Sequence, residues 1–146
     1  MRPNSLAGAV ERIRKGTPQG VALAEFVDMF DLAPTGDASY EMIADEAELT
    51  SDKRLDAMAG AIAEYLAKQC KLSQIPSWAS GKTRYLDRPW HKSSLFIDWT
   101  REVVSDAMRE YLTFASPAEF ASRNIFTEER PLRRARGPQP AKTRPA

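Results

Sequence analysis

The sequence is poor in the residues on which several large classes of protein depend. It contains one cysteine, Cys70, and one histidine, His91, among 146 residues. A single cysteine forms no intramolecular disulfide, which is typical of a reducing compartment, and this pair does not supply the ligands of a common zinc site. The seven glycines match neither common nucleotide-binding motif. We therefore predict neither a metal site nor a cofactor.

Long apolar runs are also missing from the sequence. No stretch approaches the roughly 18 apolar residues that a membrane-spanning helix needs. Near the start of the chain, the apolar residues 6–10 are followed at once by Glu11. This run is too short for the core of a secretory signal peptide. We expect a cytoplasmic protein that does not contact a membrane.

The groupings of residues that carry common enzyme chemistry are weak. His91 would be the only base for a Ser–His–Asp arrangement, and the sequence offers no nucleophile elbow, so an exposed loop residue is the favoured interpretation. The acids at 45, 46 and 48 are compatible with metal ligands or an acid/base pair, but a solvated helix face is favoured. Cys70 lies in line with Ile62 and Leu66, which favours a core residue over a reactive thiol. We predict a protein that is not an enzyme.

Apolar side chains recur at helical spacing along most of the chain, which predicts an all-α fold. We expect a single compact bundle of about five helices within residues 4–126. The segment 51–72 is the clearest, with Leu55, Met58, Ile62 and Leu66 on one side, and should form the central core helix. Thr17 and Pro18 should cap and begin the second helix. The helices are predicted at residues 4–15, 17–32, 38–47, 51–72 and 94–114, with a short one from 117 to 123.

The segment 73–92 interrupts the helical pattern with two prolines, a glycine and several aromatic residues. We expect it to fold over the core, because burial of large aromatic side chains stabilises the fold. Trp78, Trp90 and Trp99 could instead form an exposed aromatic platform; core packing is favoured, with Trp90 at a rim. Ser116 and Glu119 have the spacing of a capping box, and residues 124–126 have weak extended character.

The net charge of +1 conceals a strong segregation along the chain. Residues 16–52 contain nine acids and no base, whereas residues 130–146 contain six bases, four prolines and no acid. The last segment has one large apolar residue, Leu132, and does not bury enough surface to offset its chain entropy. We therefore predict a helical domain over residues 1–129, which is acidic, and a basic tail over 130–146 that is disordered when unbound.

Four stretches of the sequence, in this order, resemble one family. They are "RIRKGTPQGVALAEFVDMF" from Arg12, "RLDAMAGAIAEYLAKQCKL" from Arg54, "IPSW" with the later "YLDRPW" through Trp90, and "FASPAEFASRNIF" from Phe114. The family comprises small, all-helical, largely uncharacterised bacterial proteins encoded beside nucleotidyltransferase-like genes, in pairs that look like toxin–antitoxin modules. The resemblance covers residues 6–126. It implies an antitoxin-like protein that binds and neutralises a cognate toxin, with a nucleotidyltransferase-like enzyme as the partner.

Two sets of residues are candidates for binding. A strongly negative segment attracts a basic protein partner, and a basic tail attracts nucleic acid or an acidic groove, although both are also compatible with plain solubilising charge. A transcriptional regulator that binds nucleic acid through its tail is the alternative function. The candidate partner-binding residues are Glu25, Asp28, Asp31, Glu41, Asp45, Glu48, Trp90, Arg123 and Asn124. The candidate nucleic-acid-binding residues are Arg130, Arg133, Arg134 and Arg136.

Overall fold

The computed structural model describes residues 4–97, 99 and 103–134, and the predicted helical character of the protein is confirmed there. Longer helices form the bundle, and two short 3-10 helices and two strands of two residues each connect them. The α-helices are α1 (Leu6–Arg14), α2 (Gln19–Asp31), α3 (Gly36–Ala44), α4 (Lys53–Gln69), α5 (Asp106–Ala115) and α6 (Ala118–Ala121). The 3-10 helices are η1 (Ser77–Ser80) and η2 (Lys82–Arg84), and the strands are β1 (Trp90–His91) and β2 (Ile125–Phe126).

Side-chain caps set the starts of several helices. The Ser5 hydroxyl accepts a hydrogen bond from the Gly8 amide at 3.0 Å, and the Thr35 hydroxyl accepts one from Ala38 at 3.1 Å. Because Thr35 caps α3, that helix begins at Gly36, two residues before the predicted start. The predicted cap of α2 is displaced by one residue, since Pro18 rather than Thr17 occupies the capping position.

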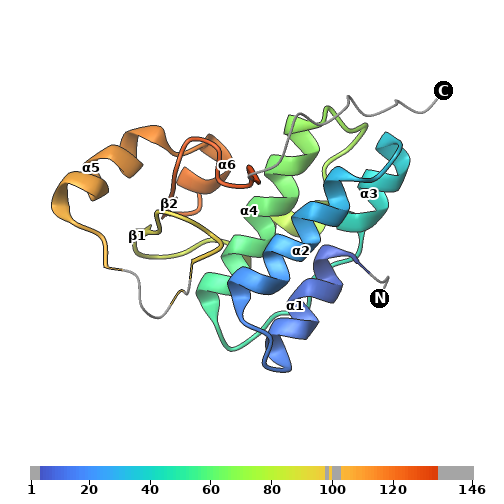
Figure 1. The fold of residues 1–146 in the computed structure, drawn as a ribbon, viewed down its shortest axis with the longest axis horizontal. Helices are drawn as coiled ribbons and strands as arrows, with labels where there is room; N and C mark the ends of the chain where they lie inside the picture. Colours follow the sequence, from blue (N-terminus) through green and yellow to red (C-terminus); the bar gives the residue numbers. More distant parts are fainter. Residues whose placement is uncertain (1–3, 98, 100–102, 135–146) are drawn as a thin grey trace.

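The central position predicted for the 51–72 segment is confirmed by α4. Helices α1, α2 and α3 lie on one side of α4, and α5, α6 and the strands lie on the other (Figure 1). At Gly60, an added Cβ would lie 2.8 Å from the Ala79 carbonyl oxygen and 2.9 Å from the Arg84 Cβ. The η1–η2 segment therefore packs directly against the backbone of α4, which only glycine permits at this position.

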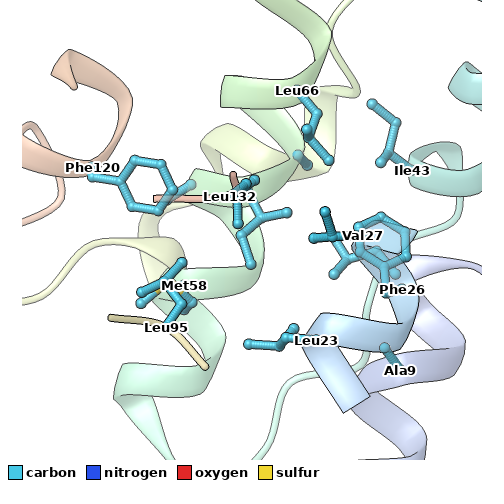
Figure 2. Packing of buried hydrophobic residues seen from close by; sticks show 14 of the residues in the cluster. Ala9, Leu23, Phe26, Val27, Ile43, Met58, Leu66, Leu95, Phe120 and Leu132 are labelled. Carbon is cyan, nitrogen blue, oxygen red and sulfur yellow. The ribbon is translucent and has the colours of Figure 1, made fainter. Parts of the chain in front are cut away.

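The main core lies between α2, α4 and the chain segments that close over them. Figure 2 shows Leu23 and Val27 of α2 and Met58 and Leu66 of α4 in one buried cluster, with Leu132 in the same cluster beside α4. All five side chains are buried. Each contributes about 1.5–3 kcal/mol to folding through the apolar surface that it removes from water. The core thus extends to the C-terminal end of the described chain.

That position of Leu132 changes the predicted end of the domain. Residues 130–134 belong to the segment expected to be disordered, yet Pro131 and Leu132 are buried, and Arg134 forms an ion pair with Asp28 at 2.9 Å. The reason is that one leucine finds a site already formed by the core of α2 and α4. The packed region extends to Arg134, and the predictions for residues 135–146 lie outside the described residues.

The predicted helix over 94–114 is wrong in its first half. Residues 94–97 form turns, and α5 begins only at Asp106, where the Ser105 hydroxyl accepts a hydrogen bond from the Met108 amide at 3.2 Å. Leu95 is buried from within the irregular segment. Trp99 packs edge-on against Trp90 at 5.0 Å between ring centroids. Helical spacing in the sequence does not distinguish a continuous helix from an irregular segment whose apolar side chains reach the core individually.

The predicted capping box at Ser116 is also wrong. The Ser116 hydroxyl donates to the Leu112 carbonyl and accepts a hydrogen bond from the Thr127 amide at 2.8 Å, so it is not available to α6. The extended character predicted for residues 124–126 is confirmed for the last two, because Ile125 and Phe126 form β2, which pairs in parallel with β1; Asn124 is left-handed instead. Within the described residues, no helix has the length and apolar character required to cross a membrane.

Candidate functional site

Part of the acidic segment predicted to bind a partner is paired with bases of the same chain. Glu25 binds Arg12 at 2.7 Å, and Glu48 forms an ion pair with Arg14. Asp28 binds Arg134. Among the other acidic candidates, Glu41 is exposed, and the carboxylates at 31 and 45 are half-buried. The charges that are segregated along the sequence are therefore intermixed in space, because the fold brings α1 and the C-terminal segment to the acidic helices.

Arg123 was predicted to contact a partner, and this prediction is wrong because its side chain is 0% exposed. Its guanidinium donates to the Glu64 carboxylate and to the backbone carbonyls of Ala79 and Glu119, each at 2.7 Å. It also lies over the Tyr85 ring, 4.7 Å from the centroid. Arg123 therefore joins α4, α6 and η1 inside the protein, and no surface is left for a partner.

Asn124 and Trp90 are structural residues as well. Asn124 adopts a left-handed backbone conformation, with φ of 64°, and its side-chain amide donates to the Leu86 carbonyl at 2.7 Å. Its own carbonyl accepts from the Trp90 amide at 2.8 Å. Trp90 was predicted at a rim, but its side chain is buried, with the Arg54 guanidinium 5.0 Å from its ring centroid. Both residues fix the aromatic segment against the turn after α6.

A second buried arginine, Arg84, was not predicted at all. It donates to the backbone carbonyls of Asp56, at 3.2 Å, and Ala47, and its guanidinium lies 4.8 Å from the centroid of the Trp78 ring. Burial lowers the pKa of Arg84, while the nearby acids Asp56 and Glu46 oppose this shift. Its role depends on carbonyls distant in sequence, so neither local spacing nor composition indicates it.

The Glu64 carboxylate is the acidic partner of the buried Arg123. Burial raises the pKa of Glu64, but hydrogen bonds and charge attraction from Arg123 and Lys68 outweigh it, so the net shift is downward. The bond to Glu64 in turn raises the pKa of Lys68. Both groups are charged at neutral pH, and the network is a structural one.

His91 differs from the exposed loop residue that was expected. Its Nε2 lies 3.1 Å from the Thr113 hydroxyl, and its ring stacks on Phe126 with centroids 5.1 Å apart. Burial, with a smaller contribution from Arg109, lowers the pKa of His91. The imidazole therefore stays neutral at pH 7 and joins β1 to α5.

The most unusual surface in the described structure is the exposed apolar side of α5. Val103, just before the helix, is 92% exposed, Phe114 is 84% exposed and Tyr111 is 53% exposed. Met108 is also exposed, and Leu112 is the one residue of α5 that is buried. We call Val103, Met108, Tyr111 and Phe114 the α5 apolar surface. Helical spacing places Val103, Met108 and Tyr111 on the apolar side of the helix predicted over 94–114, but in the structure all three side chains are exposed.

The position of α5 explains this exposure. Its main contacts are with β1 and β2, and it lies at the opposite end of the molecule from α1 and α3 (Figure 1). A shallow cavity of about 660 Å³ beside it is lined in part by Met108, Tyr111, Arg130 and Arg133. Burial raises the pKa of Glu128, which also lines this cavity. An apolar helix side is therefore flanked by charged groups of both signs.

The predicted basic residues divide into two groups. Arg130 and Arg133 are exposed beside α5, and Arg134 is bound to Asp28. Arg136 lies outside the described residues. Within the described part of the chain, no three His, Cys, Asp or Glu side chains are grouped so that they would hold a metal ion. Comparisons with protein-family models, curated proteins and solved structures found no match to this chain.

Proposed function

We propose that this protein acts by binding another protein, as an antitoxin-like inhibitor of a cognate toxin enzyme, and that α5 is its contact helix. The observation that carries the proposal is the exposure of the α5 apolar surface. The family resemblance of the sequence supports the antitoxin assignment and the choice of a nucleotidyltransferase-like partner. The role requires binding and no catalysis by this chain.

The geometry of α5 favours a protein partner. At about 3.6 residues per turn, Met108, Tyr111 and Phe114 fall next to one another on one side of the helix. Monomeric proteins seldom expose a contiguous apolar patch without a binding role. Burial of each large apolar side chain contributes about 1.5–3 kcal/mol, so three or four of them supply the centre of a protein interface.

The partner that fits this surface has an apolar groove that accepts a helix. A helix of ten residues is about 15 Å long at 1.5 Å per residue. One side of so short a helix, packed flat against a second copy, covers much less than the about 800 Å² per subunit of a standard interface. A groove encloses both flanks of the helix and reaches the neighbouring Arg130 and Arg133. We therefore assign the surface to a different protein.

This assignment replaces the acidic segment as the main contact. Glu25, Asp28 and Glu48 already bind bases of the same chain, so a basic partner would have to displace these bases. The nucleic-acid alternative has less support. Arg134 is held by Asp28, and Arg130 and Arg133 lie beside two acids, Glu128 and Glu129, which reduce the local positive potential.

Co-expression with the product of the neighbouring gene tests the proposal. The full-length chain should co-purify with that protein and relieve its inhibition of growth. The double variant Tyr111→Ser with Phe114→Ser should lose most of the binding, because each truncated anchor residue in such interfaces costs roughly 2 kcal/mol or more.

Leu32→Ser provides the matched control, because Leu32 is an apolar residue that is 64% exposed at the end of α2, away from α5. Its binding should equal that of the wild type. A complex that survives the double variant unchanged would move the interface away from α5. If no complex forms at all, the proposed antitoxin function is wrong. If the wild-type protein associates with itself instead, the α5 apolar surface binds a second copy of this chain.

A further inference from the structure

We propose that the groove between α1 and α2 is a docking site for a basic, proline-containing peptide, and that its occupant is the segment 135–146 of this same chain. The groove lies between the first two helices, whereas α5 lies at the other end of the molecule (Figure 1). The inference is therefore independent of the proposed toxin partner.

The groove has a volume of about 650 Å³ and an apolar base. Gly8 and Ala9 of α1 face Ala22 of α2 along it, and Phe26 and Met29 supply larger apolar walls. Small side chains on both helices leave the space open, since larger ones would fill it. A groove with this lining suits apolar and flat side chains such as alanine and proline.

The edges of the groove are mainly acidic. Glu11, Glu25 and Asp28 line it together with a single base, Arg12. Glu25 is more than half exposed in its pair with Arg12. Exposed pairs of this kind contribute about 0–1 kcal/mol, so an incoming base exchanges with Arg12 at little cost. The groove thus combines an apolar base with an edge that selects positive charge.

The chain itself already reaches this edge. Arg134, the last described residue, donates to the Asp28 carboxylate at 2.9 Å, and its guanidinium lies over the Phe96 ring, 4.7 Å from the centroid. Asp28 is one of the residues that line the groove. Segment 135–146 therefore starts beside the groove, and the ion pair of Arg134 fixes its point of departure.

The segment has the composition that the groove selects and is long enough to follow it. Residues 135–146 contain three bases, three prolines and no acid. An extended proline-rich chain advances about 3.1 Å per residue, and α1, with its nine residues, is about 14 Å long, so roughly five residues follow its whole length. Proline reduces the entropy lost on docking, and the tether gives the segment an effective concentration in the millimolar range.

Limited proteolysis of the full chain by trypsin tests this docking. The measured quantities are the rates of cleavage after Arg136 and after Lys142, each divided by the rate for a free peptide of residues 133–146. The docked segment should be cut about tenfold more slowly than the peptide, because proteolysis tracks the fraction of open chain. High salt should reduce this protection. Equal rates in protein and peptide would overturn the proposal.

Variants separate the groove from a general effect of charge. Replacing Glu11, Glu25 and Asp28 by Gln, Gln and Asn should remove most of the protection, and Met29→Ser should remove part of it. The matched control replaces three other exposed acids, Asp87→Asn, Asp106→Asn and Glu110→Gln, and should leave the protection unchanged. Protection that both triple variants lose equally would contradict a specific groove.

A spin label distinguishes docking within one molecule from docking between molecules. The full chain with Cys70→Ala and Ala141→Cys carries a nitroxide on the segment. The label should broaden the amide signals of Gly8, Ala22 and Glu25 and leave those of α5 sharp. In a mixture of nitroxide-labelled and separate ¹⁵N-labelled chains, the broadening should disappear. Docking within the chain would be overturned if the broadening persisted in the mixture. It would also be overturned if neither the labelled chain nor the mixture showed any broadening.

Discussion

Around α4, the apolar side chains are buried and two arginines are buried with them, whereas on α5, at the other end of the molecule, apolar side chains face solvent (Figure 1). In the first region, Arg84 and Arg123 bind backbone carbonyls of segments far apart in sequence. In the second, Leu112 is the one residue of α5 that is buried, and the side chains of His91 and Ser116 link the helix to the strand region. Stability is thus concentrated near α4, while the apolar side of α5 stays exposed to solvent.

Removal of Arg123 should have the largest effect on stability. Arg123→Met leaves the Glu64 carboxylate and the carbonyls of Ala79 and Glu119 without their donor inside the protein. Breaking a buried charge pair in this way costs about 3–5 kcal/mol. The free energy of unfolding, measured with urea, should fall by this amount. Arg109→Met on α5 should change it by less than about 0.5 kcal/mol, and equal losses in both variants would abolish the contrast between the two regions.

The substitution Gly60→Ala should have the next largest effect on stability. The new Cβ of Gly60→Ala meets the Ala79 backbone oxygen at 2.8 Å, so η1 has to shift away from α4. Overpacking of this kind costs about 1–3 kcal/mol, which exceeds the gain of up to about 1 kcal/mol in helix propensity. Thermal unfolding measures the difference. Gly81→Ala is the control, because its nearest neighbour is 3.4 Å away; a Gly60→Ala protein as stable as wild type would show that η1 packs loosely.

Acid should weaken the α4 region through Glu64. The folded protein holds the pKa of Glu64 below the ordinary value of 4.5, so its contribution to stability is present above pH 4.5 and is lost as the pH falls through the folded-state pKa. Urea midpoints from pH 7 to pH 3 measure this loss. Glu64→Gln should be less stable than wild type at pH 7 and converge with it in acid. A constant difference between the two curves would exclude the linkage.

The smallest effect on stability is expected on α5. Phe114→Ser should change the free energy of unfolding by less than about 0.5 kcal/mol, because the side chain is 84% exposed and makes few contacts to lose. Urea unfolding of Phe114→Ser, with Leu32→Ser as the control, measures this change in the free energy of unfolding. A loss above 2 kcal/mol would mean that Phe114 packs within the protein, and the proposed interface would then have to be moved.

Part of this fold could be predicted from the sequence, because the local periodicity of apolar residues encodes the helices α1, α2 and α4. The same signal failed at residues 94–97, 99 and 103–105, where Leu95 and Trp99 pack with the core although these residues are not helical. The burial of Arg84 and Arg123 could not be predicted, since most of their partners are groups that only the tertiary fold brings near. The bond of Arg123 to the Glu119 carbonyl is the local part, and helix-end carbonyls are the kind of partner that the sequence does suggest for an arginine there. The charge segregation along the sequence was misleading for a related reason. Arg14 and Arg134 lie 34 and 106 residues from Glu48 and Asp28 in the sequence but pair with them in the structure.

The burial of Leu132 has a consequence for how the chain is made. The side chain belongs to the buried cluster that α2 and α4 share, although residue 132 follows the end of α4 by more than 60 residues of sequence (Figure 2). During translation, the exit tunnel of the ribosome encloses the most recently added residues. A nascent chain that already exposes α1 to α4 therefore still lacks the Leu132 side chain in its core. The packing of this part of the core therefore becomes complete only after residue 132 has left the exit tunnel.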